Sequence, residues 1–386
     1  MTNFFLDLIN LEFFVLLLVF TISIILKLKP LQLMLLIFHV ITIFLLNDVL
    51  FDSSYMGDQR RYLEAAKSVR LFQQPADGFV NSVGISGFLF SIFPIPFMIS
   101  IQSLSMINFI IYLLLFFYLK KQNIFTYGSE IFYLLYPSLL LYSSVGLREM
   151  LILTFMIIVV YQFLVKDKYI FSVICSLPLI FLKPQNFLII NMCSTIFFFF
   201  KKGDSNKKIG ILFLIILAFF GLKNLILSRF TIPAGFGFID VINNYRNYMF
   251  FEDTRSYVEG YIPINNFFDL FYQGAIGSFY MLLKPFPWQS SNPLQLVQSI
   301  ENIIILFLMI FLVLKPINFK TLRLKANYLK MMIIISMSIY GMVVFNFGSA
   351  SRYRFGFIVV FFIFYSYLLN KNRINLLKYK SINPNI

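Results

Sequence analysis

Charged residues gather in one short stretch of an otherwise apolar chain, between Asp48 and Arg70. The stretch reads DVLFDSSYMGDQRRYLEAAKSVR, and its charged side chains are Asp48, Asp52, Asp58, Arg60, Arg61, Glu64, Lys67 and Arg70. Carboxylates and guanidinium groups beside hydrocarbon are costly unless they face water or a substrate. The stretch therefore suggests a catalytic or binding loop at a membrane surface, with an ordinary solvated loop as the alternative.

Short polar turns between apolar segments carry further basic residues. They read SSVGLRE, with Arg148 beside Glu149, LKPQN, with Lys183, and FGSASRYR, with Arg352 and Arg354. The apolar segments around Lys183 hold about 14 and 15 residues, which as helices span roughly 21 to 23 Å, less than the roughly 30 Å of the hydrocarbon core. We therefore expect Lys183 in a recess below the membrane surface, where it needs a partner or an anionic ligand. Each basic residue alone could instead form a structural ion pair or reach lipid headgroups, but four at such turns favour a binding site.

The composition places these polar groups in a membrane protein. Hydrophobic residues make up 59% of the chain, 51 residues are Phe and the mean hydropathy is +0.82, which together exclude a soluble domain. We predict an all-α polytopic membrane protein, with residues 1–386 in a single membrane domain and no cleavable signal peptide. Apolar runs predict about eleven transmembrane helices, near residues 11–26, 31–50, 104–119, 128–147, 150–165, 169–182, 186–200, 209–227, 299–314, 331–347 and 353–369.

Basic residues orient these helices. Most of them fall in segments that lie on one side of the predicted bundle, such as KKGDSNKK, KPINFKTLRLKANYLK and KNRINLLKYK. Because basic loops stay in the cytoplasm, we place these segments inside and the acidic start, with Asp7 and Glu12, outside. The net charge of +15 is then explained by orientation and by anionic membrane lipids, so no nucleic-acid partner is expected.

Residues 51–103 form the first outer, periplasmic loop of this topology. The loop leaves and returns on the outer side, so its apolar part GISGFLFSIFPIPFMIS is expected to form a juxtamembrane helix that does not cross. Another juxtamembrane helix is expected from Asp58 to Phe72. Its apolar face is formed by Tyr62, Ala65, Ala66, Val69 and Phe72, and its wet face by Arg60, Arg61, Glu64 and Lys67. The alternative, one more crossing, would reverse the distribution of basic loops.

Residues 228–298 form a long outer loop. Its Tyr, Asn, Arg and acidic residues suit a carbohydrate surface, because rings stack on C–H faces while amides and carboxylates bond hydroxyl groups. A membrane-interface belt is the alternative for Trp288. Metal ligands and cofactors are not expected, because Cys175 and Cys193 lie in apolar runs and His39, the only histidine, lies within a predicted helix. We expect His39 to be a buried helix contact.

The order of these segments resembles a known family. The acidic loop with GDQRRYLEAA, two juxtamembrane helices, a helix ending in LKKQN and the SSVGLRE, LKP and ASRYRFG turns are similar to the integral-membrane class C glycosyltransferases. Among these, the chain looks most like the O-antigen and capsular polysaccharide polymerases (Wzy-type, EpsG-like). The resemblance implies a polyprenyl-diphosphate-linked glycan as donor and chemistry on the periplasmic face of the bacterial inner membrane. It also leaves room for a chain-length regulator as a partner.

The resemblance implies roles for the singled-out residues. Asp58 would be the general base that accepts the proton of the attacking sugar hydroxyl, with Asp52 as the alternative. The first loop lacks a second acidic pair, so metal dependence stays open. The leaving diphosphate would be bound by the basic residues at the turns, Arg148, Lys183, Arg352 and Arg354. Glu149 would orient Arg148, and Arg61 and Tyr62 would contact the substrate.

We therefore expect a polymerase that joins lipid-linked oligosaccharide repeats by direct displacement at the anomeric carbon. An O-antigen ligase or a transferase that uses a polyprenyl-phosphate sugar is an alternative with the same chemistry. A lipid-linked glycan flippase is an alternative of another class, which would need charges deep within its helices. The sugar, the linkage, the stereochemical outcome and the oligomeric state do not follow from these patterns.

Overall fold

A computed structural model describes residues 2–47, 49–50, 56–76, 78–79, 81–201, 238–251 and 262–382. Every regular element within these residues is a helix, so the chain has the predicted all-α class. Five helices are long and apolar enough to cross a membrane: Phe4–Leu26, Ile101–Lys121, Pro293–Leu314, Lys320–Val343 and Phe347–Tyr379. Shorter apolar helices accompany them, and the count of about eleven crossings stays a prediction. The predicted helix at 209–227 lies outside the described residues, as do Asp48, Asp52 and residues 228–237 and 252–261 of the long outer loop.

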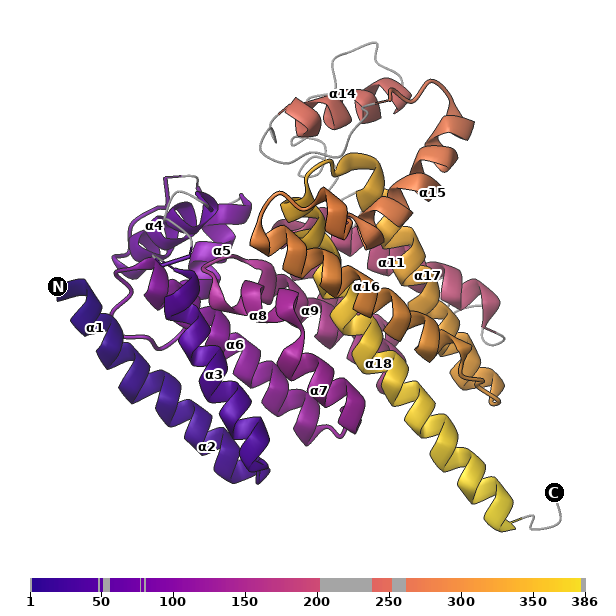
Figure 1. Cartoon of the computed structure of the whole chain (residues 1–386), viewed down its shortest axis with the longest axis horizontal. Helices are drawn as coiled ribbons and strands as arrows, with labels where there is room; N and C mark the ends of the chain where they lie inside the picture. Colours follow the sequence, from indigo (N-terminus) through magenta and orange to yellow (C-terminus); the bar gives the residue numbers. More distant parts are fainter. Residues whose placement is uncertain are drawn as a thin grey trace. The chain divides into compact units, whose positions relative to one another are not determined.

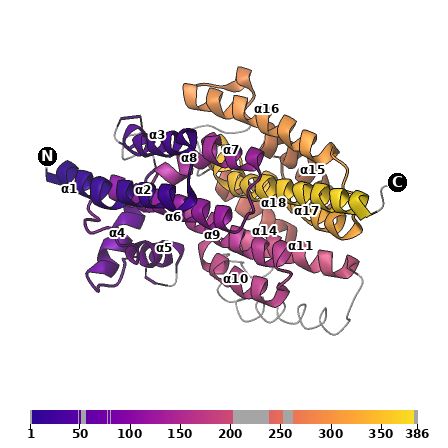
Figure 2. The same cartoon turned by 90° about the horizontal axis from the view of Figure 1, so that it is seen from below.

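The helices form two compact units, and the organisation as a single membrane domain stays a prediction. Unit 1 holds Met1–Tyr161 and Cys175–Lys183, and unit 2 holds Gln162–Ile174 and Pro184–Ile386. Each unit is described by itself. Figures 1 and 2 show the helices of both.

Unit 1 is built around α6 (Ile101–Lys121), most of whose side chains are buried. This helix contacts α2, α3, α4, α8 and α9. The bounds of the other elements are α1 (Thr2–Asn10), the π-helix η1 (Leu11–Leu16), α2 (Leu17–Leu26), α3 (Pro30–Leu46), α4 (Asp58–Arg70), α5 (Ser82–Ser91), α7 (Tyr127–Leu135), α8 (Pro137–Ser144) and α9 (Glu149–Val160). The π-helix η2 (Tyr161–Val165) begins at the last residue of this segment and belongs mainly to unit 2. The helix α10 (Tyr169–Leu182) has its second half in this unit.

A proline breaks the helix that the sequence predicts at 128–147. Tyr136 is extended, with φ −67° and ψ 112°, and Pro137 begins α8. Proline disfavours a helical conformation of the residue before it and has no N–H to donate to the carbonyl of Tyr133. The hydroxyl of Tyr112 donates to that carbonyl at 3.3 Å, and the hydroxyl of Tyr133 donates to the carbonyl of Tyr112 at 2.9 Å. The two buried rings stack with centroids 4.7 Å apart. The backbone carbonyl that the proline leaves without a donor is therefore hydrogen-bonded inside the helix bundle.

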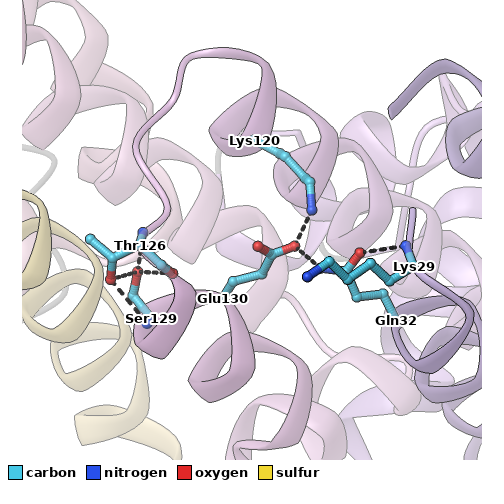
Figure 3. A network of polar contacts seen from close by, with 6 residues as sticks. All are labelled: Lys29, Gln32, Lys120, Thr126, Ser129 and Glu130. Carbon is cyan, nitrogen blue, oxygen red and sulfur yellow. Dashed lines mark hydrogen bonds and ion pairs between the residues drawn. The ribbon is translucent and has the colours of Figure 1, made fainter. Parts of the chain in front are cut away.

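Polar contacts mark the two ends of unit 1. At one end, which we call the apex end, Asn47 after α3 bonds Ser105 near the start of α6 and Ser144 at the end of α8. At the other, which we call the lysine end, Glu130 on α7 accepts from Lys120 at the end of α6 and from Gln32 at the start of α3 (Figure 3). The chain from α3 to α6 therefore leaves and returns at the apex end, where α4 and α5 lie.

The helices α4 and α5 pack closely against each other, with Gly87 of α5 facing α4 (Figure 1). Tyr62, Ala65 and Ala66 of α4 are buried as the periodicity predicts. Phe72 is not, because α4 ends at Arg70 and Phe72 follows with φ +57°, fully exposed. Lys67 was predicted on the wet face but is half-buried, and its ammonium group donates to the carbonyl of Ile99 at 2.8 Å.

Substitution of Gly87 by Ala is expected to destabilise the α4–α5 pair. The added Cβ would lie 2.6 Å from the Cβ of Ala65 and 2.8 Å from its backbone carbon, so the helices must separate. We expect a loss of about 1–3 kcal/mol in the free energy of unfolding, as for other overpacked sites. Thermal unfolding of the purified protein in detergent measures it. Gly57→Ala is the control, since nothing lies within 4 Å of its Cβ; equal melting temperatures for both variants would contradict the packing.

Unit 2 is built around α17 (Lys320–Val343), which contacts α11, α14, α15 and α18. Gly277 of α15 lies against Gly341 of α17 so closely that a Cβ added at Gly341 would be 2.1 Å from the backbone carbon of Gly277. The remaining elements are α11 (Pro184–Phe200), α14 (Phe238–Phe251), α15 (Phe267–Leu283), the 3-10 helix η3 (Pro287–Gln289), α16 (Pro293–Leu314) and α18 (Phe347–Ile382).

Two basic segments predicted to lie outside the membrane continue helices. The segment KTLRLKANYLK forms the first turns of α17, and KNRINLLKYK extends α18 to 36 residues, roughly 54 Å at 1.5 Å per residue. Leu, Lys and Arg have high helix propensity, so these segments contain no residue that would end α17 or α18. The helices predicted at 331–347 and 353–369 are therefore longer than their apolar runs.

An ion pair joins the turn before α10 to α17 within unit 2. The ammonium group of Lys325 donates to the carbonyl of Leu164 at 2.6 Å and to Oδ2 of Asp167 at 2.8 Å. Partial burial acts to raise the pKa of Asp167. Hydrogen bonds from Lys325 and Tyr169 and the charges of Lys325 and Lys201 outweigh that effect, so the pKa of Asp167 lies below its ordinary value.

Removal of this carboxylate is expected to lower stability at neutral pH but not in acid. Because the folded-state pKa is depressed, the stabilisation is complete above the unfolded pKa of about 3.9 and is lost as the pH falls through the folded value. Asp167 is about half exposed, so Asp167→Asn should cost less than about 1 kcal/mol at pH 7. Thermal unfolding of wild type, Asp167→Asn and the exposed-site control Glu64→Gln at pH 7 and pH 3 measures the effect. A difference as large at pH 3 as at pH 7 would count against the ion pair.

Candidate functional site

The turn from Ser143 to Leu147 at the apex end is held by side chains from neighbouring helices. Backbone groups at membrane depth need partners inside the protein, because lipid supplies none. Three carboxamides provide them. Asn47 Nδ2 donates to the carbonyl of Ser144 at 2.9 Å, Asn108 Nδ2 donates to the carbonyls of Val145 and Leu147 at 2.6 and 2.5 Å, and Gln59 Oε1 accepts from the N–H of Gly146 at 2.6 Å.

Hydroxyl groups extend this polar cluster toward the interior of unit 1. Thr42 and Ser144 share a hydrogen bond of 2.6 Å between their hydroxyl oxygens, and the hydroxyl of Ser143 lies 2.9 Å from Nε2 of His39. The ring of His39 is buried and packs edge-on against Phe109 and Tyr112. The prediction that His39 is a buried helix contact is confirmed.

Arg148 and Glu149 follow the turn and begin α9. Arg148 is the N-cap residue and Glu149 the first residue of the helix, where its carboxylate is favoured by the helix dipole. Glu149 is buried, and Arg148 is half-buried. Nε and Nη1 of Arg148 are buried and have no hydrogen-bond partner among the described residues. A buried charged donor without an acceptor is costly, so the group that fits beside it is an anion.

The predicted residues on α4 lie at the same end of unit 1. Asp58 opens the helix and is half-exposed, Arg61 is exposed, and Gln59 between them reaches the turn before Arg148. Tyr62 was predicted to contact substrate but is only 2% exposed and packs edge-on against Phe90 of α5. Its ring is therefore a packing residue of the α4–α5 pair.

Lys183 is buried at the end of α10, as its short flanking helices suggested. Its own N–H donates to the carbonyl of Leu179 at 2.7 Å, and Pro184 begins α11. Lys183 is therefore shielded by the protein, while its depth below the membrane surface and an anionic ligand for it stay predictions.

Arg354 has a different setting from the one expected. It is 1% exposed, and Nη1 donates to the carbonyls of Met281 and Leu282 at 2.8 and 3.3 Å while Nη2 donates to Oδ1 of Asn302. Nδ2 of Asn302 donates to the carbonyls of Leu283 and Lys284 at 3.1 and 3.0 Å. These carbonyls end α15, where a helix has no internal donors left. The contacts therefore give Arg354 a structural role as a helix cap, and its predicted role in diphosphate binding stays a prediction.

The predicted site residues fall into both units. Unit 1 contains Asp58, Arg61, Arg148, Glu149 and Lys183. Within it, Gln59 connects the segment of Asp58 with that of Arg148. Arg352, half-buried, and Arg354 belong to unit 2. The sequence analysis missed Asn47, Gln59 and Asn108. The available signal was a carboxamide inside or beside an apolar run, which is costly in a membrane unless it has a partner.

No metal centre accompanies these residues, since the described part of the chain has no group of three or more His, Cys, Asp or Glu that could hold an ion. Comparison of the chain with protein-family models, with curated proteins and with solved structures gives no match.

Arg354→Met is expected to destabilise the protein irrespective of any ligand. The substitution keeps an unbranched side chain but leaves the carbonyls of Met281 and Leu282 without their donor. Hydrogen bonds to charged groups contribute about 1.5–3 kcal/mol each, so we expect a loss of at least about 2 kcal/mol. Thermal unfolding measures it, with the exposed Arg323→Met on α17 as control. If Arg354→Met has the same melting temperature as the wild-type protein, the capping role is wrong and the predicted role in ligand binding is favoured.

Proposed function

We propose that the chain is a glycosyltransferase that polymerises polyprenyl-diphosphate-linked oligosaccharide repeats on the periplasmic face of the bacterial inner membrane. The observation that carries the proposal is Arg148, whose buried Nε and Nη1 have no acceptor in the described structure. Arginine suits a diphosphate because its planar group meets two oxygens at once and stays charged. The N-terminus of α9 adds favourable potential for an anion at the same place.

The proposed chemistry needs a base and an anion site near each other. A carboxylate of Asp58 accepts the proton of the attacking sugar hydroxyl, whose oxygen forms the new bond to the anomeric carbon. The bond from that carbon to the diphosphate breaks, and the diphosphate leaves with the electron pair. Arg148 stabilises the negative charge that develops on it, and Glu149, the next residue, is retained as a candidate for orienting Arg148. Lys183 is retained as a further candidate for the diphosphate, and Arg61 as a contact of the glycan. The role of Arg352, which belongs to unit 2, stays a prediction.

An O-antigen ligase would use the same donor and the same anion site. The two activities differ in the acceptor, which is a growing lipid-linked chain for a polymerase and lipid A core for a ligase. The length of the product therefore separates them.

Substitution of Arg148 or Asp58 is expected to stop chain growth. Arg148→Ala removes the donors to the leaving group, a change that at comparable sites costs a factor of about 10²–10³ in rate, and Asp58→Asn removes the base. We would express each variant in the cells that make the polysaccharide, quantify it in the membrane, and resolve the length of the surface polysaccharide on a gel. The expected product is a single repeat.

Matched controls are Arg323→Ala and Glu64→Gln, which change exposed residues of α17 and α4. Unchanged long chains with abundant Arg148→Ala or Asp58→Asn protein would refute the proposed site. Absence of every repeat from the cell surface would point instead to a flippase, and repeats that polymerise but stay on the carrier lipid would point to a ligase.

A further inference from the structure

Gln59 connects the segment that carries the proposed base, Asp58, with the segment that carries the proposed anion-binding residue, Arg148. It follows Asp58 on α4, is 2% exposed, and accepts the N–H of Gly146 at 2.6 Å, two residues before Arg148. The two ends of this connection are 87 residues apart in the chain. A side chain that joins them therefore acts on their relative position.

The turn itself is held to the rest of unit 1 by other residues. Asn108 on α6 bonds the carbonyls on both sides of Gly146, and Asn47 bonds the carbonyl of Ser144. Loss of Gln59 would therefore leave Arg148 anchored to α6 through the turn.

The helix α4 is held in a different way. At its C-terminal end, Lys67 donates to the carbonyl of Ile99, and Arg70 donates to the carbonyls of Ile95 and Phe93. In its middle, α4 packs on Gly87 of α5. At its N-terminal end, where Asp58 lies, Gln59 bonds it to the turn. Removal of that bond takes away one attachment of the end of α4 that carries Asp58, while the bonds at the other end remain.

We propose that Gln59 is a positioning residue, which sets the place of the Asp58 carboxylate relative to the guanidinium group of Arg148. The inference rests on the proposed function. In a direct displacement the hydroxyl attacks one face of the anomeric carbon and the diphosphate leaves from the opposite face. The base and the anion site must therefore be separated by a fixed distance. A misplacement of about 1 Å can cost a factor of about 100 in rate.

Two substitutions separate the hydrogen bond from the shape of the side chain. Gln59→Met keeps a similar length but removes the acceptor, so the buried N–H of Gly146 loses its partner. Gln59→Glu keeps an oxygen that can accept this N–H, whether the carboxyl is ionised or protonated. Gln73→Met is the matched control, since Gln73 follows α4 and is exposed.

The experiment uses the full chain, purified and placed in lipid nanodiscs, with an undecaprenyl-diphosphate-linked oligosaccharide repeat as the probe. We would measure kcat and KM for chain extension and the hydrogen exchange of the peptide that contains Gly146. For Gln59→Met we expect kcat to fall about 10- to 100-fold with KM changed less than about threefold, and exchange at the turn to rise about tenfold for each 1.4 kcal/mol lost. Gln59→Glu should restore kcat, and Gln73→Met should match wild type. Assays below the melting temperature of each variant separate positioning from unfolding.

The outcomes distinguish this inference from the proposed function. If wild type extends chains and Gln59→Met does so equally fast, Gln59 is not a positioning residue although the function stands. A rise in KM with kcat unchanged would likewise overturn the inference, because it would place Gln59 in substrate binding. If wild type itself consumes no probe, the proposed function fails and the role of Gln59 fails with it, while the exchange of Gly146 still shows whether the bond exists.

Discussion

The structure of unit 1 depends on finding partners for the backbone of one turn. Between α8 and α9 the chain reverses direction without regular structure, in a protein whose surroundings offer few donors or acceptors. Asn47, Gln59 and Asn108 bond the carbonyls and the N–H of this turn, and they come from the end of α3, from α4 and from α6. Because these segments meet at the turn, satisfying its backbone also fixes where the ends of the helices lie. The proposed anion site at Arg148 follows directly after this bonded turn.

The buried arginines of this protein have unlike roles. Arg354 ends α15 by bonding its last carbonyls, and Arg246 of α14 does the same for α17, with Nε 2.8 Å from the carbonyl of Met342. Both satisfy the negative end of a helix, where a cation is favoured. Arg148 lies at the opposite kind of position, the N-terminus of α9, where a cation is not favoured by the helix. Nε and Nη1 of Arg148 have no acceptor among the described residues, which is the arrangement expected of a binding residue, whereas Arg354 lacks a partner only at Nε and bonds through Nη1 and Nη2.

Much of the helical layout could be predicted from the sequence, because apolar runs of membrane proteins are long and their ends are marked by charge. The helix at 169–182 has the predicted bounds, and the face of α4 formed by Tyr62, Ala65 and Ala66 is buried as its period indicates. The partners of polar side chains could not be predicted in this way. Gln59 and Gly146 are far apart in the chain, and the capping role of Arg354 depends on α15, which lies within the segment predicted to be a long outer loop. Periodicity reports which face of a helix is buried and not what lies opposite it.

The break at Pro137 has a consequence for how the sequence can change. Proline withholds an N–H from the carbonyl of Tyr133, and the hydroxyl of Tyr112 replaces it from the neighbouring helix. A phenylalanine at position 112 would be tolerated only together with a residue at position 137 that restores the missing N–H, and a non-proline at 137 would release Tyr112 from its constraint. Two positions on different helices are thus bound to vary as a pair. The carbonyl that Pro137 leaves without a donor at the break is bonded by a hydroxyl group of another helix, α6.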